Sequence, residues 1–236
     1  MVNSFLKKKN FFNDETFNNL KIRLRRNKIP IKIIRGKKVL DFGCGNGRYS
    51  LALQKLGAKQ VDGFDFSKKP VNFSKKINFL NKKNLLIKSK VKYDFIFCNG
   101  ILSHRKDWKD IIKILSKILK KEGYLWLSLY PESTYWKSVD KITKSLNKNY
   151  KKDFEKLLNL RDWEENRIYF ISDLLFSERI YFSKKKIYDH LKKNKFKEII
   201  FLKRGVKKDL SEKIYFDPKL KFFFSEGEIR LVAKKL

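Results

Sequence analysis

The stretch that decides the fold is Lys38-Val-Leu-Asp-Phe-Gly-Cys-Gly-Asn-Gly47. Its first half is an apolar run of strand length, and glycines at alternating positions come directly after it. Glycine accepts backbone angles that other residues resist, and it lets the main chain approach a ligand closely. A helix that starts directly after such a turn presents free N–H groups. The stretch therefore predicts a strand, a tight ligand-binding turn and a helix.

Two aspartates extend this signal. Asp41 lies near the end of the predicted strand, and Asp65 stands 24 positions later at the tip of the next predicted strand, residues 60–64. An acidic side chain at the second position can accept hydrogen bonds from both hydroxyls of a ribose. A glycine turn that only reverses the chain does not explain why both aspartates are present. The pattern therefore indicates a nucleoside-containing cofactor.

Short strands and helices alternate around this turn. We expect further strands at 84–88, 93–98 and 123–130, and helices at 13–26, 48–56, 68–80 and 107–119. A helix at 184–194, a strand at 197–203, a long loop and a strand at 227–234 would close the fold. Such alternation is typical of parallel sheets covered on both faces. The sequence predicts an α/β fold with a doubly wound, mostly parallel seven-stranded sheet, an antiparallel terminal hairpin at its edge and helices on both faces.

The length of 236 residues suits a single domain with one core. Within it we expect an N-terminal helical lid at 1–35 and a cofactor-binding half at 36–130. A substrate-side insertion would occupy 131–185, and the closing helix and strand hairpin 186–236. Neither an internal repeat nor a linker rich in Pro, Gly or Ser interrupts the chain.

The composition limits the location and the partners. Two cysteines cannot form a disulfide framework, and no Cys/His group has metal-ligand spacing, so no metal is expected. No apolar run approaches the ~20 residues that cross a bilayer. The first ten residues also lack the apolar stretch and cleavage site of a secretory signal. We therefore expect a cytoplasmic protein without a membrane span, and the oligomeric state stays open.

The charge is strongly positive, because 58 Lys and Arg residues face 25 Asp and Glu residues, a formal net charge of +33. A field of this sign attracts phosphates, nucleic acids and anionic membrane surfaces. The lysines are spread along the chain instead of forming a block. This spread favours a generic basic surface over a dedicated nucleic-acid footprint, because charge alone supplies only non-specific affinity.

Taken together, the motifs resemble those of class I S-adenosylmethionine-dependent methyltransferases of the small-molecule type. Residues 39–47 resemble motif I, 57–67 resemble the second motif, and 93–104 resemble the fourth. Residues 119–127 are similar to the turn into the fifth strand, with Glu122 where a glycine usually stands. The resemblance covers residues 36–130 and implies a Rossmann-like transferase that uses S-adenosyl-L-methionine. Hydride transfer is disfavoured, because Arg48 replaces the last glycine of the dinucleotide fingerprint.

The resemblance also assigns residues to the cofactor. Asp41 would orient the methionine end, Asp65 would hold the ribose hydroxyls and Phe66 would lie against the adenine. Asn99, just past the fourth strand, would border the sulfonium. The usual acidic reader of the adenine amino group has no counterpart in 87–92. The expected cofactor contacts are Asp41, Gly43, Cys44, Gly45, Asn46, Gly47, Asp65, Phe66 and Asn99.

His104 is the candidate catalytic base. It lies after the fourth strand at the carboxyl edge of the sheet, where ligands bind, and histidine titrates near neutrality. A base is needed only if the acceptor must lose its proton first; otherwise alignment with the methyl group suffices. The alternative is that His104 caps the next helix or bonds within the fold. Cys98 is expected to be a small core thiol.

The methyl acceptor should be bound by the segment that comes after the fifth strand. The expected contacts are Tyr130, Tyr135, Trp136, Asp173 and Arg179, although aromatic residues often serve packing instead. The cleft would lie between 98–104 and 130–136, with 162–179 and the N-terminal helix around 12–20 as its roof. We expect methyl transfer to oxygen or nitrogen of a small metabolite or a sugar- or lipid-linked precursor.

The alternative is an RNA methyltransferase that exploits the basic surface. The Asn-Pro-Pro-aromatic motif of amino-methylating nucleic-acid enzymes is absent, which favours the small acceptor. A third interpretation, a methyltransferase fold retained as a binding module, is disfavoured by the intact turn at 41–47.

Overall fold

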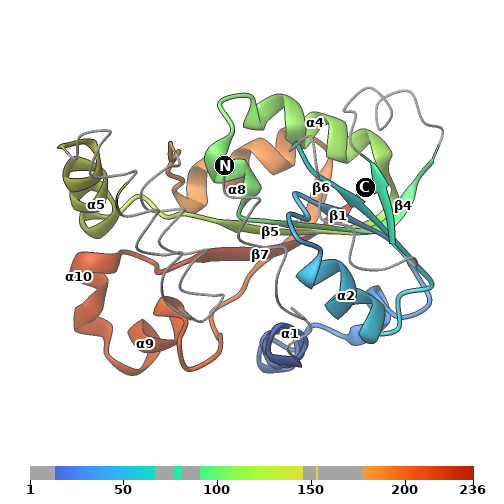
Figure 1. The fold of residues 1–236 in the computed structure, drawn as a ribbon, viewed down its shortest axis with the longest axis horizontal. Coiled ribbons are helices and arrows are strands. Elements are labelled where there is room, and N and C mark those ends of the chain that lie inside the picture. The colour runs from blue at the N-terminus through green and yellow to red at the C-terminus, as the bar shows by residue number, and fades with distance from the viewer. Residues whose placement is uncertain (1–13, 67–76, 81–90, 146–152, 154–177) are drawn as a thin grey trace.

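The computed structural model describes residues 14–66, 77–80, 91–145, 153 and 178–236 (Figure 1). Within these residues, seven strands form one sheet in the order β3-β2-β1-β4-β5-β7-β6. Strand β7 is antiparallel to both of its neighbours, and the pairs from β3 to β5 are all parallel. The predicted mostly parallel, seven-stranded sheet is confirmed. The strands are β1 Lys38–Phe42, β2 Gln60–Phe64, β3 Ile77–Leu80, β4 Tyr93–Asn99, β5 Leu119–Leu129, β6 Phe196–Phe201 and β7 Ile229–Lys235.

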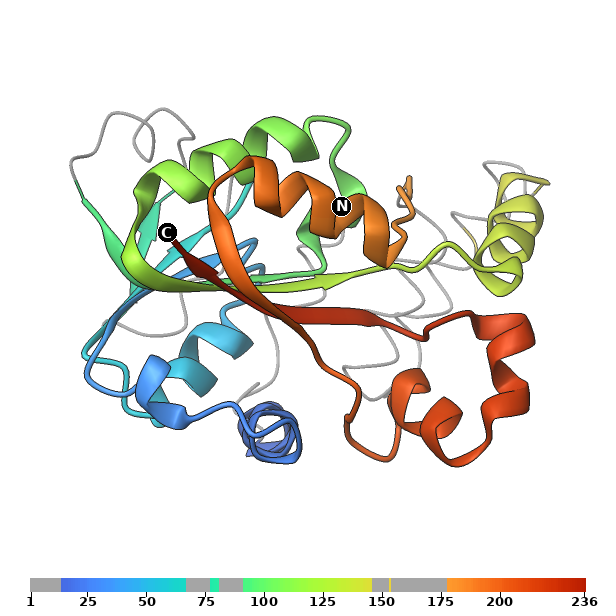
Figure 2. The same ribbon diagram turned by 180° about the vertical axis from the view of Figure 1, so that it is seen from behind.

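Helices cover both faces of the sheet, as predicted. Helices α4 and α8 lie on one face, and α1 and α2 lie on the other (Figure 1). Figure 2 shows the same two layers from behind. The helices are α1 Asp14–Arg26, α2 Arg48–Lys55, α4 Trp108–Ile118, α5 Thr134–Ser145, α8 Lys184–Lys193, α9 Leu210–Phe216 and α10 Lys221–Phe224, with short 3-10 turns η2 Ile31–Ile33, η3 Ile101–His104 and η4 Pro218–Leu220.

The strands alternate between two hydrophobic cores. In β4, Ile96 and Cys98 join the core beneath α4 and α8, whereas Phe95 and Phe97 join the core beneath α1 and α2. Successive side chains of a strand point to opposite faces, so a strand covered on both sides must be apolar throughout. This explains why residues 95–98 are all apolar and are recognisable as a buried strand; Asp94, near the start of the strand, is half-buried and accepts hydrogen bonds from Lys38 and Lys120.

Two predictions concern the sheet edge beside β2. The helix expected at 68–80 is wrong at its end, and the strand expected at 84–88 lies outside the described residues. The helix expected at 68–80 does not reach Leu80, because Ile77–Leu80 is strand β3, paired in parallel with β2. A segment of only four residues cannot be assigned to helix or strand by periodicity, and pairing with β2 decides it. The first part of that helix, 68–76, and the strand expected at 84–88 lie outside the described residues.

The predicted antiparallel pairing of the terminal strands at the sheet edge is confirmed, because β6 pairs antiparallel with β7. The connection between the two strands differs from the expected one. Strand β7 lies inside the sheet between β5 and β6, so β6 forms the edge. The predicted long loop is wrong, because α9, η4 and α10 lie between these strands. Asp209 takes the N-cap position of α9, and the Asp217 carboxylate accepts a hydrogen bond from the backbone N–H of Lys219 at η4. Of these two aspartates, Asp217 is the one whose side chain makes a capping hydrogen bond. Helices this short carry too little periodicity to be recognised in the sequence.

Strand β5 begins four residues earlier than expected, directly after α4. Glu122, which stands where the family pattern has a glycine, adopts a φ of 63°. Two lysines, Lys197 and Lys234, pair with its carboxylate at 2.9 and 2.8 Å. A left-handed conformation is costly for a residue with a side chain. These ion pairs hold Glu122 at the bend between the first residues of β5 and its sheet-paired part.

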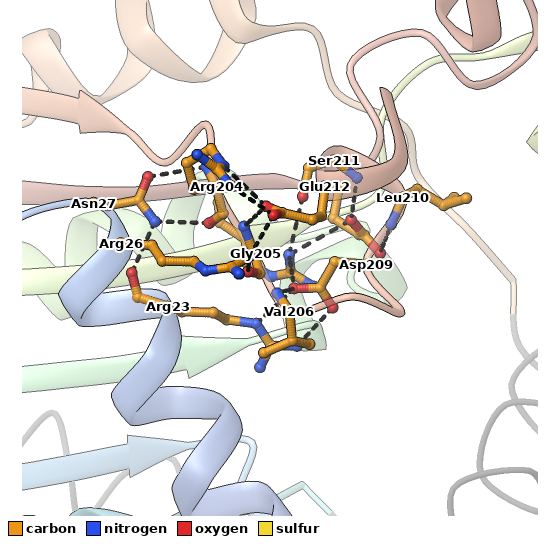
Figure 3. Close-up of polar contacts among 12 residues, drawn as sticks. Arg23, Arg26, Asn27, Arg204, Gly205, Val206, Asp209, Leu210, Ser211 and Glu212 are labelled. Carbon is orange, nitrogen blue, oxygen red and sulfur yellow. Dashed lines mark hydrogen bonds and ion pairs between the residues drawn. The ribbon is translucent and has the colours of Figure 1, made fainter. Parts of the chain in front are cut away.

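Buried charges tie α1 to the segment before α9 (Figure 3). Asp209 accepts hydrogen bonds from Arg23 at 2.7 and 2.8 Å and from Arg230 at 3.0 Å. Glu212 accepts from Arg26, from Arg204 and from the backbone N–H of Gly205. Burial alone would raise the pKa of Asp209, but the Arg23 hydrogen bonds and the charge of Arg230 hold it below its usual range. The network fixes α1 against the C-terminal part of the sheet.

None of the helices in the described part of the chain is long and apolar enough to cross a membrane.

Candidate functional site

The glycine turn lies between β1 and α2, at the carboxyl edge of the parallel strands. The backbone N–H groups of Gly43 and Cys44 donate to the carbonyl oxygen of Phe64 at 2.7 and 3.0 Å. Gly43 has a φ of 84°, and a Cβ there would lie 2.6 Å from the Cβ of Ile101. Only glycine fits this position without moving Ile101. The turn is therefore held between the ends of β2 and β4.

Gly45 faces open space at the tip of the turn. A Cβ at this residue would meet no atom within 4 Å, and the φ is 52°. Its backbone N–H donates to Oδ2 of Asp65 at 2.8 Å. Two features that are 20 positions apart in the sequence are thus in direct contact. A ligand can approach the main chain here while the carboxylate of Asp65 lies beside it.

Asp41 lies beneath this turn and is only 2% exposed. The hydroxyl of Ser50, in the first turn of α2, donates to its carboxylate at 2.6 Å. Burial raises the pKa of Asp41 to about 7, and the nearby charge of Asp65 adds to the rise. The predicted methionine-orienting residue is thus a carboxyl group that changes its charge near neutral pH. Ser50 was not predicted, because no local sequence signal pairs it with Asp41.

Asn46 and Gly47 complete the turn. Asn46 is buried, and its side-chain oxygen accepts from the backbone N–H of Arg48 at 3.3 Å. Gly47, with a φ of 84°, takes the N-cap position of α2. The amide of Asn46 therefore satisfies one of the free N–H groups at the start of the helix.

Phe66 packs against the predicted adenine side of the site. Its ring meets those of Phe42 and Phe64 edge to face, at 5.7 and 5.0 Å between centroids. The guanidinium of Arg105 lies over the Phe66 ring at 4.2 Å and is held by two hydrogen bonds to Asp107. A cation over an aromatic face is attracted by the ring quadrupole. Sequence reasoning missed Arg105, because a cation–π pair leaves no spacing signal.

Asn99 is the last residue of β4, opposite Ser128 of β5. The next residue, Gly100, has a φ of 86° and turns the chain into η3. Cys98 is buried just before it, and burial raises the pKa of its thiol well above the usual value. Burial likewise raises the pKa of Cys44. Both thiols are therefore neutral and unsuited to nucleophilic attack, so Cys98 is the core thiol that was predicted.

His104 ends η3 and lies half-buried beside β5. Its Nδ1 lies 3.1 Å from the carbonyl oxygen of Glu178. A carbonyl can only accept, so Nδ1 carries the proton in this hydrogen bond and Nε2 of the neutral ring keeps its lone pair. The ring of Tyr130 meets the imidazole edge to face at 5.6 Å. These contacts place the ring beside the end of β5, and the contact with Glu178 is a hydrogen bond within the fold, as the alternative interpretation of His104 predicts.

Four of the five predicted acceptor residues come together after β5. Trp136 contacts Tyr130 at 4.6 Å and Tyr135 at 5.1 Å between ring centroids. The guanidinium of Arg179 lies 5.7 Å from the Trp136 ring. The side chain of Arg179 is 1% exposed and pairs with Asp140 of α5 at 2.6 Å, so this ion pair holds α5 in place. The fifth residue, Asp173, lies outside the described residues.

Ser103 fastens this cluster to η3. Its hydroxyl accepts from the backbone N–H of Tyr130 at 2.9 Å, and its carbonyl accepts from Ile180 at 2.7 Å. The two predicted walls of the acceptor cleft, 98–104 and 130–136, are thus hydrogen-bonded to each other. Sequence reasoning missed Ser103, because its partners are distant in the chain.

The predicted roof is described only in part. Residues 12–13 and 162–177 lie outside the described residues, and Leu20 of α1 is buried in the core beside α2. An open hollow lies instead between α5 and α10, lined by Ser133, Thr134, Lys137, Lys221 and Phe222 among others. No group of His, Cys, Asp and Glu side chains that could hold a metal occurs in the described part of the chain.

Comparison with known proteins adds to this geometry. The family model described as "Methyltransferase domain" matches residues 15–192. A tRNA U34 carboxymethyltransferase of Sulfurimonas denitrificans is 32% identical over 135 residues, 51% of this chain and 43% of that protein. A ubiquinone biosynthesis O-methyltransferase of Pelagibacter ubique is 35% identical over 114 residues, 45% of this chain and 46% of that protein. The chain thus matches less than half the length of these two relatives.

Among solved structures, a magnesium protoporphyrin IX methyltransferase from Synechocystis PCC 6803 with bound SAH has a TM-score of 0.52. It is 18% identical, and the match covers 94% of this chain and 83% of that one. At this identity the likeness concerns the fold.

Proposed function

The chain belongs to the methyltransferase domain family, whose methyl donor is S-adenosylmethionine. From this membership we propose a class of methyl acceptor and the residues that bind the cofactor and the acceptor. We propose that the protein transfers a methyl group to oxygen or nitrogen of a small metabolite or of a sugar- or lipid-linked precursor. The observation that carries the proposal is the contact between Gly45 and Asp65 at the carboxyl edge, above the buried Asp41. In doubly wound sheets this edge is where ligands bind.

The residues present fit the cofactor. The open space at Gly45 admits a ligand against the main chain, and Asp65 lies beside it to accept hydrogen bonds from ribose hydroxyls. Asp41 places a carboxylate beneath the cationic methionine end, and Phe66 offers an aromatic surface on the adenine side. The wall of the proposed cofactor site is completed by Asn99, Cys44, Asn46 and the neighbouring glycines.

S-adenosylmethionine supplies a methyl group activated by a sulfonium. When bound, it would let the acceptor's lone pair form a bond to the methyl carbon while the carbon–sulfur bond breaks and the sulfur keeps that electron pair. The protein's task is to hold the acceptor in line with the methyl group. His104 removes the acceptor proton through Nε2, because its Nδ1 is engaged with the Glu178 carbonyl. Tyr130 and Tyr135 line the acceptor side, and Trp136 and Arg179 support them.

The test has two parts. Calorimetry with S-adenosylmethionine should give a dissociation constant of about 1 μM or tighter, roughly −8 kcal/mol. Cofactor carrying a labelled methyl group should then label a compound in a metabolite pool or a lipid extract. A chain that binds no cofactor contradicts the proposal at its first step. If the label is found in RNA alone, the proposed class of acceptor is contradicted.

A second candidate, methyl transfer to tRNA, is favoured by two observations. One relative bears the name tRNA U34 carboxymethyltransferase, and the net charge of +33 would attract phosphates. If the basic surface is generic, RNA binding will be weak, indifferent to sequence and lost steeply between low and physiological salt. Tight binding to one tRNA at physiological salt, with label incorporated into it, would establish the second candidate in place of the first.

A further inference from the structure

Four aromatic side chains stand exposed within nine residues of the segment between β6 and β7. Tyr215 and Phe216 end α9 and are 53% and 72% exposed; Phe222 and Phe223 in α10 are 80% and 54% exposed. We call these four residues the aromatic tip. Other strongly exposed apolar side chains in the described part of the chain, Ile142, Tyr188, Ile200 and Leu236, come singly from separate places. Clustered exposed aromatics mark an interaction site, whereas single ones are ordinary.

The aromatic tip is fixed to the body of the protein. The guanidinium of Arg204 lies over the Tyr215 ring at 4.0 Å and donates two hydrogen bonds to the buried Glu212. Glu212 belongs to the ion network that also holds α1 (Figure 3). On the α10 side, the ring of Phe224 contacts Tyr135 of α5 at 5.0 Å. The segment that carries the exposed rings is therefore held to the rest of the protein at both α9 and α10.

The surroundings of the aromatic tip are basic. Lys213, Lys219 and Lys221 are exposed within the same segment, on a chain whose net charge is +33. Asp217 is an exposed acid among them, and Glu226 pairs with Lys221 at 3.1 Å. Aromatic rings beside lysines are the composition of surfaces that lie in the interface of an anionic bilayer, with rings in the acyl boundary and ammonium groups at the phosphates.

The aromatic tip also lies on the side of the molecule where β5 ends, at the carboxyl edge of the parallel strands. Figures 1 and 2 show α9 and α10 together at one corner, with α5 beyond the end of β5 on the same side. Tyr135, an expected acceptor residue, contacts Phe224 directly behind the aromatic tip. The open hollow between α5 and α10 is lined by Phe222 and by the ammonium-bearing Lys137 and Lys221. A surface bound to the aromatic tip would therefore lie next to the proposed acceptor side.

We propose that the aromatic tip docks the protein on the surface of an anionic phospholipid bilayer. Phe216, Phe222 and Phe223 enter the boundary between headgroups and acyl chains, and the adjacent lysines contact lipid phosphates. This docking goes beyond the proposed methyl transfer and does not require it. Where both hold, the acceptor is delivered from the membrane, which selects the lipid-linked class among the proposed acceptors.

Two other occupants fit less well. Single-stranded RNA binds by stacking successive bases on ring faces. Here the rings within each pair stand at 89° and 90° to one another, and Arg204 covers the Tyr215 ring. A second copy of this chain would bring two strongly positive bodies together, which like-charge repulsion opposes. A fluid lipid interface demands neither stacking geometry nor shape complementarity, and its charge is complementary.

The experiment uses the full chain and vesicles of phosphatidylcholine, with or without phosphatidylglycerol, in a co-sedimentation assay. The wild-type protein should bind the anionic vesicles and hardly bind the neutral ones. Phe222→Ser with Phe223→Ser should lower the partition constant by about 10- to 100-fold, as expected for two rings leaving an apolar boundary. The matched control, Tyr188→Ser with Ile200→Ser, removes two exposed apolar side chains elsewhere and should bind as the wild type does.

Charge is tested separately. Lys219→Gln with Lys221→Gln should weaken binding by about fivefold per lysine, whereas Lys192→Gln with Lys193→Gln on α8 should change it less. Cofactor titration and thermal unfolding of each variant show that the protein remains folded. They also separate the two proposals, because a wild type that binds vesicles but no S-adenosylmethionine refutes methyl transfer alone.

Three results would overturn the docking proposal. The first is unchanged binding of anionic vesicles by the Phe222 and Phe223 variant. The second is loss of binding to a single-stranded oligonucleotide by that variant while vesicle binding persists, which would make the aromatic tip a nucleic-acid surface. The third is a wild-type dimer that the variant abolishes, which would make it a self-association surface.

Discussion

Replacing Asp41 with asparagine should make the protein more stable at neutral pH and a poorer binder of its cofactor. Asp41 is 2% exposed, and its carboxylate accepts a hydrogen bond from Ser50 at 2.6 Å. An asparagine has nearly the same shape, and its side-chain oxygen can still accept from Ser50. The variant therefore removes the charge of Asp41 while preserving the packing.

The magnitude is set by the pKa of Asp41, which burial raises from 3.8 to about 7. Between these values the unfolded chain is ionised and the folded chain holds its proton, so the folded state loses stability as the pH rises. The stability is fully present below the unfolded pKa and is lost once the pH has passed the folded pKa. A pKa difference of one between the two states corresponds to about 1.4 kcal/mol, so the total loss is about 4 kcal/mol at most.

The assay is thermal or chemical unfolding of both proteins without cofactor at pH 5 and pH 8. The difference in unfolding free energy, variant minus wild type, should increase by about 3 kcal/mol across this range. For a chain of this length that is a difference of roughly 6–12 °C in Tm. Taking the difference removes the pH dependence of the other charges. A difference that stays flat, or that moves in favour of the wild type, would refute the reasoning.

Cofactor binding should respond in the opposite direction. S-adenosylmethionine carries positive charge, so its binding favours the ionised form of Asp41 and releases a proton near neutrality. The affinity of the wild type should then rise from pH 6 to pH 8, by less than tenfold per pH unit. Asp41→Asn should bind more weakly and with little pH dependence. Equal affinities in calorimetry would show that the charge has no role in binding and that Asp41 is only a buried structural group.

Three further residues can be tested by substitution. Asp65→Ala should weaken cofactor binding by about 1.5–3 kcal/mol, because hydrogen bonds to a charged acceptor are lost; unchanged affinity in calorimetry would remove Asp65 from the ribose. His104→Ala should lower turnover by about 10²–10⁴ with cofactor affinity unchanged; a full rate would leave alignment alone as the source of catalysis. Asp209→Asn should cost about 3–5 kcal/mol of stability, because Arg23 loses its buried partner. Asp189→Asn, which breaks an exposed pair with Lys185, should cost less than about 1 kcal/mol; similar losses in the two variants would contradict the role given to burial.

Sequence reasoning succeeded where the signal is local. The glycines after Lys38–Phe42 fix the turn through backbone angles, and that information is carried by the residues themselves. The buried strand β4 is visible in the sequence because an apolar run of its length between turn signals has few other interpretations. The same holds for α4, whose apolar residues repeat at helical spacing.

It failed where a feature depends on contacts with residues far along the chain. Strand β3 exists as a strand because β2 pairs with it, and Asp209, the residue before α9, is held by Arg23, which is 186 residues away. Ser103 and Arg105 were missed for the same reason, because their contacts with Tyr130 and Phe66 arise only from the closed sheet. Patterns within a window of the sequence hold no information about such pairs.

The segment after β4 positions one residue on each side of the candidate site. His104 is the last residue of η3, and Arg105 leaves it in an extended conformation, with φ −127° and ψ 111°. Successive side chains of an extended backbone point in opposite directions. Accordingly, His104 meets Tyr130 on the proposed acceptor side, whereas Arg105 lies over Phe66 on the proposed adenine side. Consecutive residues of one short segment therefore position the proposed base and the cation that covers Phe66.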